Sequence, residues 1–288
     1  MEYVMELNNV TKRFKGFSVE DMNLKIQRGF VTGFIGANGA GKSTTIKMIM
    51  NLLKPDDGSI QVFGQGYDRH EKAIKERIGF VYDSNVFFEG LSLKDIKRIV
   101  APAYKHWDDE CFKRYIEQFE LPLNKAIKTF SKGMKMKASL AIALSHDAEL
   151  IIMDEPTAGL DPVFRRELLD LLQEIMLDGK RTLFFSTHIT TDLDRIADYI
   201  TFIRNGRLVF NQSIHDIADN YALVKGRIDH LDRDTEQAFL HIRRTSTGFE
   251  ALTDNRSSIR EIFGDHVVIE KANLEDIMYH LKGDTKHA

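Results

Sequence analysis

The sequence predicts an α/β protein with a mostly parallel core sheet, and two observations support this. A short apolar run at 29–35 leads through a glycine-rich segment into a helical pattern. The same order of apolar strand, helix and strand returns in the second half, at 149–153, from Pro162 onward and at 181–186. Connections of this kind place parallel strands in one sheet with helices on both faces. With 288 residues, the chain is long enough for one large domain with an appendage or for two smaller domains.

The glycine-rich segment after the first strand predicts a phosphate-binding loop. Its glycines let the backbone adopt positive φ angles and approach an oxyanion closely, where a Cβ atom would obstruct it. The lysine that follows can reach the β and γ phosphates of a nucleotide, the next hydroxyl can bind Mg²⁺, and the helix dipole favours the anion. A glycine-rich turn that only caps a helix is the alternative. The predicted nucleotide-binding residues are Gly36, Asn38, Gly39, Ala40, Gly41, Lys42, Ser43 and Thr44, and Ser43 is also a predicted metal ligand.

Between the first helix and the second half of the sheet, the pattern changes from turn to mostly helix. The first helix is expected from Lys42 to about Leu53, and Pro55–Gly58 is typical of a turn. From Glu71 to about Ala148 the spacing is mostly helical, with a polar and aromatic break at 104–109. This pattern predicts an inserted helical subdomain that covers about residues 84–148.

The second half is expected to complete the sheet and then to change character. Asn205–Gly206 is predicted to join two short β-like runs as a hairpin. Beyond about Ser213 the segments are short and mixed, so the predicted domains are residues 1–212 and a small accessory domain at 213–288. In the helix that starts at Pro162, the residues expected to face inward are Leu168, Leu169, Leu171, Leu172 and Ile175.

Two adjacent carboxylates end the strand at 149–153, and they indicate metal and water chemistry. Asp154 can hold Mg²⁺ through a water molecule opposite Ser43, while Glu155 points the other way and can accept a proton from an attacking water. An acidic pair on the surface at a strand end is the alternative. The position of this pair, after a phosphate loop and before Pro156, favours the catalytic interpretation.

With these motifs in place, the chain resembles the ATP-binding subunit of ABC transporters. Phe130–Met134 lies where that family has its signature loop, and Ala158–Asp161 matches the family's D-loop. His188 matches the switch histidine, and Phe14 matches the aromatic residue that stacks on adenine. The resemblance covers Glu6 to about Gln212. A surface histidine and a core aromatic residue are the alternatives for His188 and Phe14.

The resemblance implies a fold, ligands and partners. The implied fold is a P-loop NTPase of the ABC ATPase type, with an N-terminal antiparallel β portion, an inserted helical subdomain and a small C-terminal accessory domain. Two subunits of the family hold two ATP molecules head to tail, so ATP, Mg²⁺ and a second, identical or related ATPase subunit are implied. Ser131 and Gly133 are expected to contact a γ-phosphate, with Asp161 as a further nucleotide-binding residue, while His188 holds that phosphate or the attacking water.

The chain departs from the family pattern at two places. Asp83 stands where the family has a glutamine or sometimes a glutamate. It is expected either to reach Mg²⁺, as a catalytic and metal-binding residue, or to couple its loop to a membrane partner. In the signature loop, Lys132 replaces a glycine and Met134 replaces a glutamine. Lys132 either adds positive charge near the phosphates or is solvated, and the basic residues Lys135 and Lys137 favour solvation.

Composition limits the class of protein. Hydrophobic residues make up 43% and charged residues 29%, as in an ordinary soluble protein, and the net charge of −3 argues against bulk binding of nucleic acid. No stretch approaches the ~20 apolar residues that span a bilayer. The single cysteine, Cys111, cannot form an internal disulfide, and the N-terminus lacks the pattern of a secretory signal. We therefore expect a cytoplasmic protein, and the resemblance implies that it is peripheral at the cytoplasmic face of the cell membrane.

Within the family, the sequence favours a subunit of a bacterial exporter. It has neither the two cassettes of a soluble translation factor nor the long coiled coil of a DNA-repair ATPase. Asn273–Met278 is similar to an ending found in ATPases of bacterial export systems, and 104–112 with Asp83 resembles exporters of antibiotics or peptides, such as the staphylococcal exporters of phenol-soluble modulins. The expected function is ATP hydrolysis that drives export through separate transmembrane permease subunits. A soluble ATP-dependent switch or regulator and a nucleotide-binding scaffold with little turnover are the alternatives.

Overall fold

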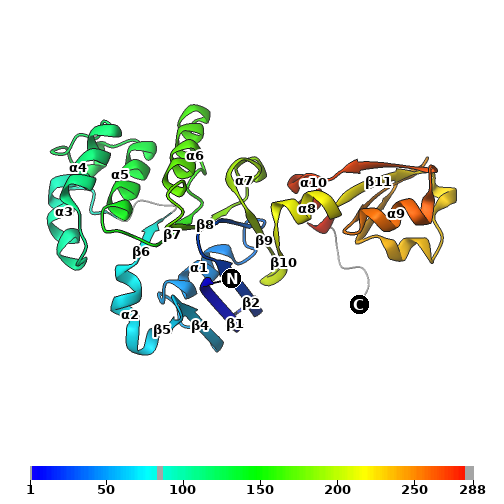
Figure 1. The fold of residues 1–288 in the computed structure, drawn as a ribbon, viewed down its shortest axis with the longest axis horizontal. Coiled ribbons are helices and arrows are strands. Elements are labelled where there is room, and N and C mark those ends of the chain that lie inside the picture. Colours follow the sequence, from blue (N-terminus) through cyan, green and yellow to red (C-terminus); the bar gives the residue numbers. More distant parts are fainter. Residues whose placement is uncertain (1, 83–86, 283–288) are drawn as a thin grey trace. The chain divides into compact units, whose positions relative to one another are not determined.

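The chain folds into two compact units. A computed structural model describes residues 2–82 and 87–282. The first unit is Met1–Asn211 and the second is Gln212–Ala288; Figure 1 colours both along the sequence. Within the two described ranges, none of the helices combines the length and the apolar character that a bilayer crossing requires.

A six-stranded sheet lies at the centre of the first unit (Figure 1). Its strands, in their order across the sheet, are β10 (Arg207–Ser213), β9 (Tyr199–Arg204), β3 (Val31–Ile35), β8 (Thr182–Thr187), β7 (Leu150–Asp154) and β6 (Ile78–Val81). β3 pairs in parallel with β8 and β9, and β7 pairs in parallel with β6 and β8. Every residue of β3, β7 and β8 is buried, as expected of parallel strands covered on both faces. The predicted mostly parallel sheet is confirmed.

A helix follows each of the three fully buried strands, β3, β7 and β8. α1 (Lys42–Ile49) follows β3, α6 (Pro162–Met176) follows β7, and α7 (Thr190–Ile196) follows β8. α1 ends earlier than expected because Asn51 adopts a left-handed conformation with φ 53°, which stops a helix. α6 begins at Pro162, as predicted, and Leu171 is only partly buried. The other residues expected on its inner face are buried: Leu168, Leu169, Leu172 and Ile175.

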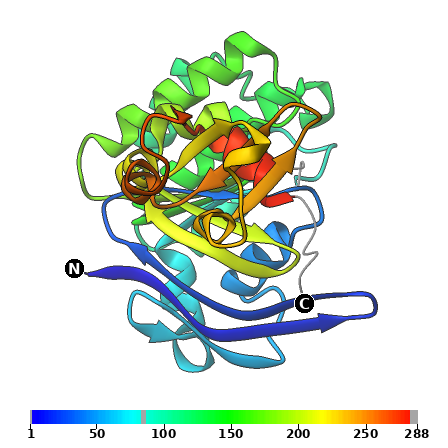
Figure 2. The same ribbon diagram turned by 90° about the vertical axis from the view of Figure 1, so that its right-hand side faces the viewer.

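An antiparallel sheet forms the N-terminal part of the first unit, which confirms the expected β portion. Its strands, in order, are β2 (Phe17–Gln27), β1 (Tyr3–Phe14), β4 (Asp57–Val62) and β5 (Gln65–Gly66). Figure 2 shows β1 and β2 as a long dark-blue pair. Buried side chains from these strands join a core cluster with Phe34 of β3 and Ile46 of α1. β4 begins inside the segment that was expected to be only a turn.

The region predicted to be mostly helical also contains a strand. Its helices are α2 (Tyr67–Glu76), α3 (Leu93–Val100), α4 (Asp109–Gln118) and α5 (Lys132–Leu144), with short 3-10 turns at Ala101–Ala103 and Ile127–Thr129. The mostly helical pattern expected from Glu71 did not predict β6, because a run of four residues is too short for periodicity to separate strand from helix. The predicted break at 104–109 is confirmed, since α4 starts only at Asp109, with Asp108 as its N-cap.

The hairpin that ends the six-stranded sheet was predicted correctly. Asn205 and Gly206 join β9 to β10 with φ angles of 48° and 76°. A Cβ atom at Gly206 would lie 1.8 Å from the Ser18 carbonyl oxygen of β2, so only glycine fits at this point.

The second unit contains a small antiparallel sheet with helices around it. Its strands, in order, are β12 (His241–Arg244), β13 (Phe249–Thr253), β11 (Ala222–Gly226) and β14 (Val267–Lys271). Its helices are α8 (Ile214–Asn220), α9 (Arg256–Phe263) and α10 (Leu274–Lys282), with 3-10 turns at Ile228–His230 and Thr235–Ala238. A separate core packs Val224, Phe249, Ala251, Ile259 and Phe263 together.

Candidate active site

The loop between β3 and α1 has the backbone conformation of a phosphate cradle. Gly39 and Gly41 adopt φ angles of 81° and 112°, which side chains disfavour. A Cβ atom at Gly36 would lie 2.5 Å from the Ile203 carbonyl oxygen of β9, so the loop can lie this close to the sheet only with glycine there. Glycine is therefore required for two reasons: Gly39 and Gly41 allow the positive φ angles, and Gly36 leaves space for the close approach to β9.

Lys42, the first residue of α1, is a buried cation at the base of this loop. Its side chain is only 5% exposed. The ammonium nitrogen Nζ donates to the Gly36 carbonyl at 2.7 Å and lies 3.1 Å from Glu155 Oε1. A buried charge needs such partners, because burial without them costs several kcal/mol. The same ammonium group is the one that a bound phosphate would attract.

Asp154 and Glu155 lie at the carboxyl end of β7, as predicted. Asp154 is buried, and its Oδ1 accepts a hydrogen bond of 2.5 Å from the Ser186 hydroxyl. Asp154 pairs with Ser186 in the register of β7 and β8, which explains the contact. Glu155 has a φ angle of 47°, and its backbone N–H donates to Ser186 Oγ at 3.0 Å. The strand end is thus held by Ser186, a residue to which the sequence analysis gave no role.

Glu155 joins Lys42 to His188. While Oε1 contacts Lys42, Oε2 lies 2.8 Å from Nδ1 of His188, which directly follows β8. His188 is 42% exposed, whereas Glu155 is 14% exposed. A carboxylate held between a buried lysine and an accessible histidine is well placed to exchange a proton with a water molecule.

Lys42, Glu155 and His188 border one open cavity of about 670 Å³, and the predicted metal ligand Asp154 does not. The cavity brings together residues predicted from three separate motifs, and their roles in binding and catalysis stay predictions. Gly36 and Ala40 belong to the same loop but do not border the cavity. The lining residues are Phe17, Asn38, Gly39, Gly41, Lys42, Ser43, Thr44, Lys132, Glu155, Ala158 and His188.

The aromatic residue at the cavity is Phe17 rather than Phe14. Phe17 lines the cavity, while Phe14 is 46% exposed and stacks on Phe17 with ring centroids 6.3 Å apart. The two rings flank the turn between β1 and β2, since Phe14 ends β1 and Phe17 begins β2. Phe17 was not among the predicted site residues, although a second phenylalanine three positions after Phe14 was a visible signal. The role of Phe14 stays a prediction.

The signature loop and the D-loop mostly lie outside the cavity of their own chain. Ser131 caps α5, with its Oγ accepting from the Met134 N–H at 3.2 Å. Asp161 caps α6, accepting from Phe164 N–H at 3.0 Å. Gly133 packs against Phe164, where a Cβ atom would lie 2.9 Å from the ring. Of the signature loop, only Lys132 reaches the cavity. Asp83 lies outside the described residues, and its two expected roles stay predictions.

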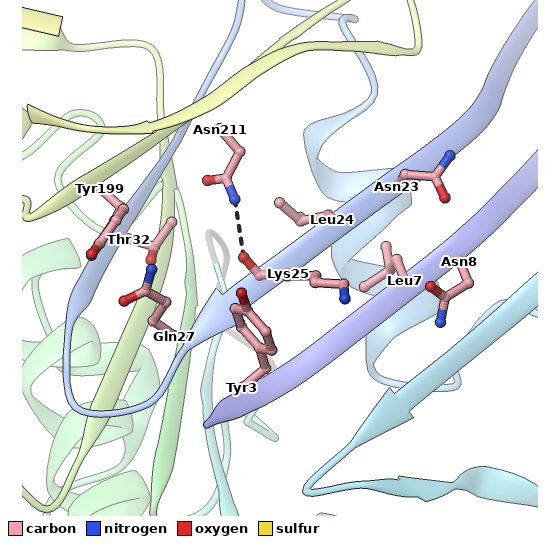
Figure 3. Close-up of a pocket in the computed structure, with 10 residues that line it drawn as sticks. All are labelled: Tyr3, Leu7, Asn8, Asn23, Leu24, Lys25, Gln27, Thr32, Tyr199 and Asn211. Atoms are coloured by element: carbon pink, nitrogen blue, oxygen red, sulfur yellow. Dashed lines mark hydrogen bonds between the residues drawn. The ribbon is translucent and has the colours of Figure 1, made fainter. Parts of the chain in front are cut away.

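A second hollow, of about 380 Å³, lies elsewhere in the first unit. Figure 3 shows side chains of β1 and β2 on one side and Tyr199 and Asn211 on the other, with Asn211 Nδ2 donating to the Lys25 carbonyl at 3.0 Å. None of the residues predicted for nucleotide, metal or catalysis lines it. The phosphate-loop cavity is therefore the candidate active site.

Comparison with known proteins identifies the family of this chain. Residues 19–158 match the family described as ABC transporter. The bacitracin transport ATP-binding protein BcrA of Bacillus licheniformis is 33% identical over 214 residues, which are 73% of this chain and 69% of BcrA. The Nod factor export ATP-binding protein I of Cupriavidus pinatubonensis is 28% identical over 304 residues, covering 97% of this chain and 91% of that protein.

Solved structures agree as well. An ATP-binding subunit of an ABC transporter superposes with a TM-score of 0.68 at 30% identity, covering 75% of this chain and 92% of that one. CbiO1 from Clostridium perfringens, described as part of the ABC transporter complex cbiONQ, gives a TM-score of 0.64 at 26% identity, covering 74% and 89%. The P-loop NTPase fold predicted from the sequence is confirmed. The chain belongs to the ABC transporter ATP-binding proteins, and it is an ATP-hydrolysing transporter subunit.

Proposed function

We propose that this chain hydrolyses Mg²⁺-ATP to drive export of peptides or antimicrobial compounds through separate membrane subunits. The observation that carries the hydrolytic part is Glu155, held between Lys42 and His188 at the edge of the phosphate-loop cavity. The direction of transport is supported by relatives whose names state bacitracin transport and Nod factor export. Exporters of amphipathic peptides, of the kind that release staphylococcal phenol-soluble modulins, are the finer proposal.

The proposed reaction is attack of water on the γ-phosphorus of ATP. The loop amides and Lys42 bind the phosphates, so ATP exchanges the contact between Lys42 and Glu155 for one between Lys42 and phosphate. Glu155 is then free to orient the water and to accept its proton as the new P–O bond forms. The bond to the β,γ-bridging oxygen breaks, giving ADP and phosphate. His188 holds the γ-phosphate or the water in place.

Mg²⁺ is proposed to accompany the nucleotide, and the donor groups fit it. The Ser43 hydroxyl lines the cavity, and Asp154 is a buried carboxylate beside Glu155; both are the hard oxygen ligands that Mg²⁺ prefers. Ser186 orients the Asp154 carboxylate. When bound, the ion would neutralise charge on the phosphate oxygens. Asp83 is a further candidate ligand, or a residue that couples hydrolysis to the membrane subunit.

A second ATPase subunit, identical or related, is proposed to complete the nucleotide site. Ser131, Gly133 and Asp161 lie outside the cavity of their own chain, which suits contacts with a nucleotide bound to a partner. Because ATP carries the γ-phosphate that these groups would bind and ADP does not, ATP would favour the closed pair. The pair is proposed to work at the cytoplasmic face of the membrane, on permease subunits.

Purification from membranes tests this proposal. A tagged chain, produced in its native host and extracted with mild detergent, is expected to bring down a protein with several membrane-spanning helices. Peptide export by those cells is expected to stop in the Glu155→Gln variant while the complex still assembles. If the chain carries out its full ATP-dependent activity in a membrane-free extract, without any membrane partner, a soluble switch or regulator is the better assignment.

A further inference from the structure

Lys132 makes a specific contact that its position in the signature loop did not predict. It is the first residue of α5, directly after the N-cap Ser131. Its Nζ donates a hydrogen bond of 2.5 Å to the carbonyl oxygen of Ala158, in the D-loop of the same chain. The side chain is therefore tied down rather than free in solvent, although the residue is largely exposed.

The D-loop is shaped to receive this ammonium group. Gly159 has a φ angle of 68°, and a Cβ atom there would lie 2.8 Å from Lys132 Nζ. Any larger residue at 159 would therefore be strained in this backbone conformation, and its Cβ atom would also crowd the Lys132 ammonium group. The donor on α5 and the space in the D-loop are two independent features that fit each other.

Three further contacts join α5 to the helix that follows the D-loop. Gly133 packs against the Phe164 ring, and Lys137 Nζ lies 4.8 Å from the centre of that ring. Lys137 Nζ also lies 3.8 Å from Glu167 Oε2. Together, these contacts join Lys132, Gly133 and Lys137 of α5 to Ala158, Phe164 and Glu167. Of the three α5 residues, Lys132 is the one that reaches the turn after β7.

One backbone hydrogen bond connects Ala158 to Glu155, the residue whose carboxylate borders the cavity. The Ala158 N–H donates to the Glu155 carbonyl at 3.1 Å, which closes a turn directly after β7. Glu155 itself has a positive φ, a conformation that surrounding contacts must maintain. Lys132 holds the far end of this turn through the Ala158 carbonyl, while Ser186 holds its near end.

We infer that Lys132 is a positioning residue for hydrolysis, fixing the turn 155–159 so that Glu155 faces the attacking water. This rests on the proposed role of Glu155. Lys132 also lines the cavity, so a phosphate is a competing partner for its ammonium group. The two roles differ in what they affect: a positioning residue changes turnover, whereas a phosphate ligand changes the affinity for ATP.

The kinetic test uses Lys132→Met, which keeps the length of the side chain and removes its charge. We expect kcat to fall about tenfold, the effect of losing one hydrogen bond from a charged donor, while KM for ATP stays within about twofold. Lys132→Arg, which restores a cation, is expected to recover most of kcat. Lys128→Met, at an exposed lysine just before the signature loop, is the matched control and should leave both parameters unchanged.

Hydrogen exchange of the nucleotide-free chain separates this inference from the role of Glu155. We expect the amides of 156–161 to exchange faster in Lys132→Met than in the parent and the Lys128→Met control. A raised KM with unchanged exchange would make Lys132 a phosphate ligand and overturn the inference. Faster exchange with an unchanged kcat would also overturn it. Normal turnover in Glu155→Gln would instead reject the proposed function, whatever the exchange shows.

Discussion

Two glutamates bracket β7, and each of them contacts two basic side chains. Glu155, after the strand, contacts Lys42 and His188. Glu149, before the strand, accepts hydrogen bonds from Arg28 and from both Nε and Nη2 of Arg77. The two residues are of the same type and each has two basic partners, yet only Glu155 borders the phosphate-loop cavity.

The partners explain the difference between the two ends of the strand. Arg77 is committed to Glu149 by two hydrogen bonds, and its guanidinium group lies 3.7 Å from the centre of the Phe63 ring. Lys42, in contrast, holds Glu155 through a single contact and lies in a loop built for anions. An ion pair therefore indicates function more strongly when a ligand can replace one of its two groups, as phosphate can replace Glu155 at Lys42. An ion pair whose groups are held by other contacts, such as Glu149 with Arg77, indicates structure.

The largest expected effect is on turnover in Glu155→Gln, which tests whether the two glutamates differ in function. Without a carboxylate to accept the proton, kcat should fall by about 10² to 10⁴. ATP should still bind, because the loop amides and Lys42 are intact. We expect an ATP-bound pair to accumulate, measured by light scattering together with phosphate release. A variant that stays monomeric with ATP and hydrolyses it normally would remove Glu155 from the mechanism.

The next effect is on binding, in Lys42→Ala. This change removes the cation that faces the phosphates, so the affinity for ATP should fall by about 10² or more, the value of one or two strong charged contacts. An equilibrium titration with a non-hydrolysable ATP analogue measures it. Lys47→Ala, at an exposed lysine on the same helix, is the control and should bind normally. Unchanged affinity in Lys42→Ala would contradict the assignment of the loop.

The sequence alone predicted those parts of the site that are continuous segments of the chain. The phosphate loop and the Asp154–Glu155 pair are continuous segments whose chemistry depends on neighbours in the chain, so their spacing predicted both the strand ends and the helix start. The contact between Ser186 and Asp154 depends instead on the register of β7 against β8. The bond from Lys132 to Ala158 depends on how α5 packs, whereas the neighbouring basic residues Lys135 and Lys137 favoured a solvated lysine there.

The smallest expected effect is on stability, in Glu149→Gln at the other end of β7. Loss of the charged bonds to Arg77 and Arg28 should lower the free energy of unfolding by about 1 kcal/mol at neutral pH, a modest value because solvent reaches all three groups. Turnover should stay within about twofold of the parent. Urea unfolding measures the first quantity and phosphate release the second.

The same variant gives a dependence on pH with a definite sign. Hydrogen bonds from Arg77, and then from Arg28, lower the pKa of Glu149 below its ordinary value of 4.5. The parent's extra stability is therefore complete above pH 4.5 and is lost as the pH falls through the lowered pKa, where the folded state also takes up the proton. The difference in unfolding free energy between parent and Glu149→Gln should accordingly be constant from neutral pH to about pH 5 and shrink on further acidification. A difference that grows in acid, or a loss of turnover at neutral pH, would mean that the two ends of β7 are not separate in function, since Glu149 would then act on the same chemistry as Glu155.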